Sequence, residues 1–377
     1  MRYRIVISCL LVLSLVGTSL GLREIAVVSR AQTVAARQNA FEYHQLSRHE
    51  SPRLYGSWLK RTQFAPFVEI ANAEFPIPAL ALGYIPQGMA YSTALNAFVL
   101  TFYYPGYLRP SIIALVDAQS SEFIKQLYLR NVNGQPYKGH AGGAAAWGDH
   151  VWVTSNNRAH RLAVEDIRQT PNGGTVQFRD AFHTGTRASI AFADNDMLWI
   201  GDFYRTGRAP YHFDQQRDKA SGNSARMAGF HLGESEPMGV IGLRRNGDAP
   251  APQAVLSIPD HAQGATLAST GEFLLSTSFA SRRPSYLWVF PSLINMMEQP
   301  PAYHATHGRH ENVPIWVISE DMALKQQIMP SMSEGVTRRG ETIYVVFESA
   351  ALLYRERALL FADYVFSMPE NRLIPER

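Results

Sequence analysis

The stretch that decides the fold is residues 333–348, which read Ser-Glu-Gly-Val-Thr-Arg-Arg-Gly-Glu-Thr-Ile-Tyr-Val-Val-Phe-Glu. It contains a polar residue, a small residue, a short apolar run, a turn at 339–341 and a second apolar run that ends in a polar residue. Four other stretches follow the same plan: 87–91 leading to 98–103, 142–146 leading to 151–155, 188–192 leading to 197–203, and 263–267 leading to 273–278. The turns between the paired runs are rich in Gly, Asn and Asp, which favour β-hairpins.

Five restarts of one two-strand unit predict a repeat architecture. A two-sheet sandwich with coincidental glycines does not account for the restarts, whereas each restart fits the inner hairpin of a propeller blade. We therefore predict an all-β protein that forms a five-bladed β-propeller. The restarts are unevenly spaced, so a six-bladed ring remains the alternative. The repeated small residue has a physical reason, because inner strands crowd around a narrow axis and glycine lets their backbones approach closely.

Strand-like runs after each pair predict the outer strands of the blades. The predicted outer strands are 111–117 and 123–129, 160–164 and 176–182, 227–232 and 254–258, and 286–290 and 315–319. After the fifth pair, only 363–368 resembles a strand. We expect 73–79, upstream of the first repeat, to supply the missing strand, because that pairing joins the chain ends and removes open sheet edges.

The N-terminus has the features of a targeting segment. Arg2 and Arg4 precede an apolar run over 5–16, and a small-x-small cleavage site follows at 19–21. We predict that 1–21 is a signal peptide, with an uncleaved anchor as the alternative. The protein is therefore expected to be secreted or periplasmic, or attached to the membrane through its N-terminus.

The rest of the chain reads as one domain with a helical N-terminal extension. We place the extension at 22–72, with its helix over 22–47, and the propeller at 73–377. Cys9, the single cysteine, lies in the signal segment, so disulfides do not stabilise the mature protein. The signal segment carries two arginines and no acid, so its removal lowers the formal charge from +3 to +1. Nothing in that charge favours nucleic acid as a partner, and we expect a monomer.

Repeat geometry predicts where a ligand would bind. In a propeller, the loops that enter the innermost strands and the loops that leave the second strands open on one face, called here the axial face. The positions next to those strand ends are polar in every repeat, and concave polar ends of this kind commonly bind ligands. The predicted ligand-binding residues are Gln87, Tyr103, Asn156, Asp202, Gln263 and Ser278.

Two carboxylates on this face, Glu334 and Glu348, belong to one hairpin. Close carboxylates push their pKa values apart, which suits acid–base chemistry, or they share a hard cation such as Ca²⁺, with Asp202 as a third metal ligand. His140 and His261 precede inner strands and join the two glutamates as predicted catalytic residues. The structural alternative is that these polar groups satisfy backbone atoms and one another without a ligand.

Three motifs carry a resemblance to a known family. Residues 85–89 (Ile-Pro-Gln-Gly-Met), 140–143 (His-Ala-Gly-Gly) and 333–336 with 347–350 (Ser-Glu-Gly-Val and Phe-Glu-Ser-Ala) resemble a group of exported bacterial β-propeller proteins. The resemblance covers residues 84–368 and implies the propeller fold and export. The chain is more loosely similar to calcium-dependent propeller hydrolases, including phytase-like and nucleotidase propellers, but it lacks their dense acidic ligand sets.

These observations support two functional hypotheses for the axial face. The first is an exported propeller that binds a small polar molecule, a glycan or a cell-envelope partner, for which Tyr103 and its neighbour Tyr104 suit sugar stacking. The second is a metal-assisted hydrolase or lyase, with Glu334 or Glu348 as general base and His140 or His261 as acid. A scaffold that uses its rim for protein contacts is a third interpretation.

Overall fold

The computed structural model describes residues 54–55, 62–206, 221–234, 236, 238–243 and 249–375. The predicted signal segment at 1–21 and the predicted helix at 22–47 lie outside these residues. Among the described residues, no helix is both long enough and apolar enough to span a membrane.

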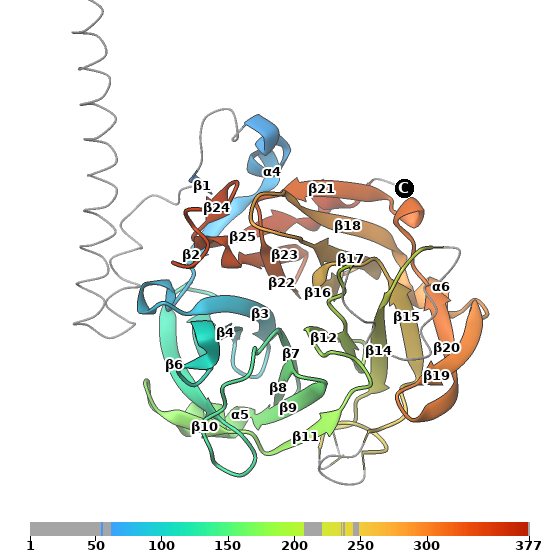
Figure 1. Cartoon of the computed structure of the whole chain (residues 1–377), viewed down its shortest axis with the longest axis horizontal. Coiled ribbons are helices and arrows are strands. Elements are labelled where there is room, and N and C mark those ends of the chain that lie inside the picture. The colour runs from blue at the N-terminus through green and yellow to red at the C-terminus, as the bar shows by residue number, and fades with distance from the viewer. Residues whose placement is uncertain are drawn as a thin grey trace, which may run out of the picture.

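The chain is a five-bladed β-propeller, which confirms the predicted fold (Figure 1). Blade 1 contains, from the axis outwards, β3 (Ile85–Ser92), β4 (Ala97–Tyr103), β5 (Ile112–Asp117) and β6 (Phe123–Arg130). Blade 2 contains β7 (Gly143–Trp147), β8 (His150–Ser155), β9 (Arg158–Ala163) and β11 (Asp180–His183). Blade 3 contains β12 (Ile190–Asp194), β13 (Met197–Gly201), β14 (Ala225–His231) and β15 (Ala254–Ile258).

The last two blades complete the ring. Blade 4 contains β16 (Ala262–Leu267), β17 (Glu272–Thr277), β18 (Ser285–Ser292) and β21 (Lys325–Met329). Blade 5 contains β22 (Ser333–Arg339), β23 (Thr342–Phe347), β25 (Tyr364–Pro369) and, as its outermost strand, β2 (Asn72–Pro76). The N-terminal strand thus closes the ring by pairing antiparallel with the C-terminal one, as the leftover runs in the sequence indicated. Because that pairing needs both chain ends, it fixes the first and last blades to each other.

The glycines of the repeat lie where inner strands of neighbouring blades touch. A Cβ added to Gly88 would stand 2.4 Å from the backbone nitrogen of Ala144, and one on Gly335 would stand 2.3 Å from that of Met89. A Cβ on Gly264 would stand 2.4 Å from the carbonyl oxygen of Glu334. No side chain fits at these distances. The small residue therefore recurs because the inner strands pack backbone to backbone around the axis.

Two predicted outer strands pair elsewhere than expected. The run predicted at 176–182 divides into β10 (Thr175–Gln177), which pairs parallel with β6 of blade 1, and β11 of blade 2. The run predicted at 315–319 overlaps β20 (His310–Val317), which pairs parallel with β15 of blade 3 and antiparallel with β19 (Tyr303–His307). The fourth strand of blade 4 is instead β21, whose polar sequence Lys-Gln-Gln-Ile-Met gave little strand signal.

Short helices and one extra strand pair complete the structure. The α-helices are α4 (Ala65–Ile70), α5 (Val164–Gln169), α6 (Leu293–Met297) and α7 (Glu370–Leu373). The 3-10 helices are η1 (Leu80–Leu82), η2 (Pro105–Tyr107), η3 (Glu320–Met322) and η4 (Glu348–Ala350). The helix α4 packs on blade 5 through Phe67, whose ring lies 5.4 Å from that of Phe366. The strand β1 (Leu54–Tyr55) pairs with β24 (Phe361–Ala362) beside blade 5 (Figure 1).

Candidate functional site

Glu334 and Glu348 come together at the axial end of blade 5. Glu334 follows the first residue of β22, and Glu348 follows the last residue of β23. Ser333 pairs with Phe347 across this hairpin, so the two glutamates leave the same end of it. The register shifts between Ser333 and Val336, which places Glu334 in an irregularity of the strand. Glu334 is buried, whereas Glu348 stays partly accessible.

The two carboxyl groups share a proton. Burial, the charge of Glu348 and a hydrogen bond to Glu348 raise the pKa of Glu334 well above its usual range. Burial also raises the pKa of Glu348 to about 7, opposed by hydrogen bonds from Glu334 and Gln87. Because two adjacent carboxylates cannot both ionise cheaply, Glu334 keeps its proton and donates it to Glu348. Near neutral pH the pair therefore carries one negative charge or none.

Glutamines from both neighbouring blades hold this carboxyl pair. Gln87 of blade 1 donates its amide N–H to Oε2 of Glu348 at 3.0 Å. Gln263 of blade 4 donates its amide N–H to Oε1 of Glu334 at 2.9 Å. Both glutamines precede the repeated glycine of their own inner strand, so the repeat itself aims them at blade 5. The pair thus lies where blades 4, 5 and 1 meet.

Tyr103 and Tyr354 lie near Glu348, and Tyr107 and His140 pack against Tyr103. The hydroxyls of Tyr103 and Tyr354 lie 3.2 Å apart, and the charge of Glu348 adds to burial in raising the pKa of both phenols, that of Tyr354 to about 12. The ring of His140 packs 4.3 Å from that of Tyr103, and its Nδ1 lies 3.3 Å from the hydroxyl of Tyr107. The phenols of Tyr103 and Tyr354 therefore stay protonated and can donate hydrogen bonds at physiological pH.

Exposed apolar side chains border the tyrosines. Tyr107 and Leu108, on the connection from β4 to β5, are 47% and 73% exposed, and Leu353, on the connection from β23 to β25, is 51% exposed. Tyr107 and its predecessor Gly106 both have positive φ, of 56° and 66°. Isolated exposed apolar residues are common, but these three share the two connections that carry the tyrosine cluster.

The structure places His261, Ser278 and Asn156 in the connections themselves. The imidazole of His261 stacks on Phe279 at 4.6 Å, and its backbone bonds with Tyr204 and Ser278. The Ser278 hydroxyl accepts a hydrogen bond from Ser285 at 3.1 Å. Asn156 is exposed and forms, with Asn157, the two-residue turn between β8 and β9. Both asparagines have positive φ, as a type I′ turn requires.

Asp202 is buried at the axial end of blade 3 and is bonded to backbone. Its Oδ1 accepts the N–H of Arg187 at 2.5 Å, and its Oδ2 accepts the N–H of Arg226 at 3.3 Å. Burial raises its pKa to about 6, opposed by these hydrogen bonds and by the two arginine charges. Asp202 therefore ties the loop that enters β12 to β14.

A calcium site would need oxygen atoms beyond those of the carboxyl pair, because Ca²⁺ takes six to eight oxygen ligands. The part of the chain that the structure describes contains no group of three or more His, Cys, Asp or Glu side chains able to hold a metal ion. Metal binding by Glu334, Glu348 and Asp202 stays a prediction.

Sequence reasoning did not single out Tyr107 and Tyr354. Both lie in connections without a strand pattern, and Tyr354 follows β23 by several residues. The only sequence signal was the unusual length of the connection between β23 and β25, which a hairpin does not need.

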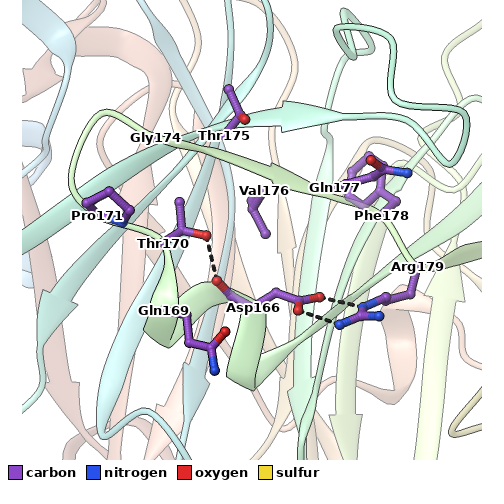
Figure 2. Close-up of a pocket in the computed structure, with 10 residues that line it drawn as sticks. All are labelled: Asp166, Gln169, Thr170, Pro171, Gly174, Thr175, Val176, Gln177, Phe178 and Arg179. Atoms are coloured by element: carbon purple, nitrogen blue, oxygen red, sulfur yellow. Dashed lines mark hydrogen bonds and ion pairs between the residues drawn. The ribbon is translucent and has the colours of Figure 1, made fainter.

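A separate pocket of about 640 Å³ lies at the outer side of the propeller, between α5 and β10 (Figure 2). None of the predicted site residues lines it. Arg179 and Asp166 form an ion pair across it, and Thr170 donates its hydroxyl to the carbonyl of Asp166 at 2.6 Å (Figure 2). Its polar groups thus bond largely with one another.

Comparisons with known proteins identify no family for this chain. No protein-family model matches the chain, and no curated protein matches it in sequence. It is similar to the solved structure of a PQQ-bound aldose sugar dehydrogenase from Streptomyces coelicolor, with 13% identity, a TM-score of 0.42, and coverage of 85% of this chain and 99% of that one. It is also similar to the glutaminyl cyclase of Myxococcus xanthus, with 9% identity, a TM-score of 0.39, and coverage of 79% and 97%.

Proposed function

We propose that the protein binds a small polar ligand on its axial face, over Glu348, Tyr354, Tyr107 and His140. The observation that carries this proposal is the buried carboxyl pair, held by Gln87 and Gln263 and open to solvent only at Glu348. A propeller does not need two carboxyls in contact, and strongly perturbed ionisable groups cluster at functional sites.

The chemistry of the surrounding groups suits a hydroxyl-rich ligand such as a glycan. Glu348 accepts hydrogen bonds, the tyrosine hydroxyls donate them, and the exposed ring of Tyr107 offers a face for stacking. Cell-envelope glycans also match the export that the N-terminal segment predicts. Export itself is tested by cell fractionation of the full chain and of a chain lacking residues 1–21.

A thermal-shift screen of mono- and oligosaccharides tests binding, because a ligand that binds only the folded state raises Tm. The expected result is a saccharide that stabilises the protein, with the shift lost in Tyr354→Ala and Glu348→Gln. Glu341→Gln is the matched control, since Glu341 is exposed at the opposite end of the same hairpin. A shift that survives both axial variants would place the ligand elsewhere.

The second candidate is a hydrolase or lyase on the same face, favoured by the shared proton. In this interpretation Glu348 is ionised and accepts a proton from the substrate or from water as general base, while Glu334 keeps the proton that the pair already shares. His140 stands beside the tyrosines and can serve as acid. A metal-assisted version would use Ca²⁺ at the carboxyl pair. Turnover that disappears in Glu348→Gln while ligand binding persists would establish the enzyme, and its pH profile would show an apparent pKa near 7.

A further inference from the structure

We propose that the ligand of the axial face carries an organic cation, such as a quaternary or primary ammonium group, bound at Glu348. This inference rests on the proposed binding function and deepens it by naming the charge of the ligand. Two independent features of the site point to it: among the described residues the carboxyl pair has no ion-pair partner, and tyrosine rings lie beside Glu348.

The first feature is the absence of a cationic partner. In the part of the chain that the structure describes, no ion pair involves Glu334 or Glu348. The hydrogen bonds of their carboxyls come from two glutamine amides and from each other. Arg355, the next arginine along the chain, donates twice to the carbonyl of Ala350 and stacks on Phe361. A buried carboxylate without a cation is costly, and a cationic ligand removes that cost.

The second feature is the aromatic wall. Tyr103, at the end of β4, and Tyr354, on the connection after β23, lie near Glu348, and the ring of Tyr107 lies 5.7 Å from that of Tyr103. The face of an aromatic ring attracts cations, and rings beside a carboxylate form the usual receptor for quaternary ammonium groups. The exposed Leu108 and Leu353 offer apolar contacts for the alkyl part of such a ligand.

Other ligand charges fit the site less well. An anion would meet the charge of Glu348, and a neutral hydroxyl compound would bond to the carboxylate without neutralising it. A hard divalent ion prefers six to eight oxygen ligands. The pair offers two carboxyls, one of which holds the shared proton, and its other neighbours are phenols and two glutamine amides that donate N–H groups to it.

Titration calorimetry with choline and its neutral isostere 3,3-dimethyl-1-butanol tests the proposal, because the two probes differ only in charge at the quaternary centre. We expect choline to bind the wild-type protein about tenfold more tightly than the isostere. Glu348→Gln should reduce that ratio several-fold, leaving only the preference that the tyrosine rings supply, and Tyr354→Ala should weaken both probes. Choline binding at pH 7 should also release protons, seen as an enthalpy that depends on the buffer, because the cation favours ionised Glu348.

Several outcomes would overturn the cation proposal. They are equal affinity for the two probes, a preference for choline that is undiminished in Glu348→Gln, Kd values above about 10 mM for both probes, or Ca²⁺ binding that depends on Glu334 and excludes choline. If Glu348→Gln does not fold, the affinities of the wild-type protein for the two probes at about pH 5.5 and about pH 8 give the comparison, because protonation of Glu348 at the lower pH should weaken choline and leave the isostere unchanged. A saccharide that binds through Tyr354 while choline does not would overturn the cation inference alone. Binding of choline that is insensitive to both axial variants would overturn the axial site as well.

Discussion

The axial ends of blades 3 and 5 both bury acidic side chains, but the two regions use them differently. In blade 3, Asp202 accepts two backbone N–H groups and ties the loop entering β12 to the neighbouring strand. In blade 5, the carboxyls of Glu334 and Glu348 bond, among the described residues, with each other and with the glutamine side chains of adjacent blades. Burial of an acid is therefore not itself a sign of function. The informative difference is whether the carboxylate is the hydrogen-bond acceptor of backbone N–H groups.

The same contrast holds for the polar residues of the strand connections. In blade 2, two asparagines join β8 to β9 in the shortest turn that a hairpin allows. In blade 5, a long connection carries Tyr354 to within 3.2 Å of Tyr103 before β25 begins. Its length exceeds what the fold requires, which is how loops that carry function usually differ from loops that only connect.

The largest effect is expected for Asp202→Ala, which removes the acceptor of two backbone N–H groups in a buried place. We expect a loss of about 3 kcal/mol in the free energy of unfolding, measured by urea denaturation. Asp117→Ala is the matched control, because Asp117 also accepts two backbone N–H groups but does so in an exposed turn. Equal losses of unfolding free energy in the two variants would mean that burial of the Asp202 carboxylate does not increase the contribution of its hydrogen bonds to stability.

Asn156→Val tests whether Asn156 is a turn residue. A β-branched side chain at its φ of 50° is strained, so we expect a loss of about 1–2 kcal/mol in urea denaturation. Asn156→Gly should change stability little, since glycine accepts positive φ. If Asn156→Gly instead abolishes ligand binding without loss of stability, Asn156 belongs to the binding site after all.

The pH dependence of stability distinguishes blade 5 from blade 3. The pKa of Glu348 is raised to about 7 on folding, so the folded state holds its proton more tightly, and stability falls as pH rises towards and through 7. Asp202 has a pKa of about 6, so its contribution to the fall in stability is complete at a lower pH than that of Glu348. His160 and His307, whose pKa values burial lowers to about 4, act in the opposite direction and only below about pH 6.5.

Between pH 6.5 and 8 the carboxyl pair should therefore dominate. Glu334 stays protonated in the folded state over this interval and Glu348 loses its proton within it, so we expect the free energy of unfolding to fall by about 2–3 kcal/mol, measured by urea denaturation at several pH values. A flat profile, or a rise, would contradict a shared proton in blade 5.

The smallest effect is expected for Glu348→Gln, which replaces one carboxyl with a neutral amide of the same shape. This variant should remove the part of the loss between pH 6.5 and 8 that comes from Glu348, about 1 kcal/mol, and should leave the part that comes from Glu334. The exposed Glu341→Gln should keep the wild-type profile. An unchanged slope in Glu348→Gln would assign the titration to another group.

The sequence predicted the inner two strands of every blade, because close packing at the axis requires a small residue that recurs visibly in the sequence. Backbones meet at the axis, so Gly88, Gly264 and Gly335 admit no side chain and recur with the hairpins that follow them. The same repeat placed Gln87, Gln263, Glu334 and Glu348 at one end of the ring. The outer strands were harder, since β10 and β20 pair with the edges of neighbouring blades and β21 is too polar to resemble a strand.

By itself, then, the sequence determined the propeller, its closure by strands from both chain ends and the face on which polar groups gather. The tertiary structure alone decided which of those groups meet. Three contacts depend on how the blades and connections pack: the contact between the carboxyls, the approach of Tyr354 to Tyr103 and the hydrogen bonds of Asp202 to backbone. Some of the residues that these interactions join are hundreds of positions apart in the sequence. A repeat fixes where each strand ends. It does not fix which side chain of a neighbouring blade contacts the residue at that strand end, because contacts between blades form only when the ring closes.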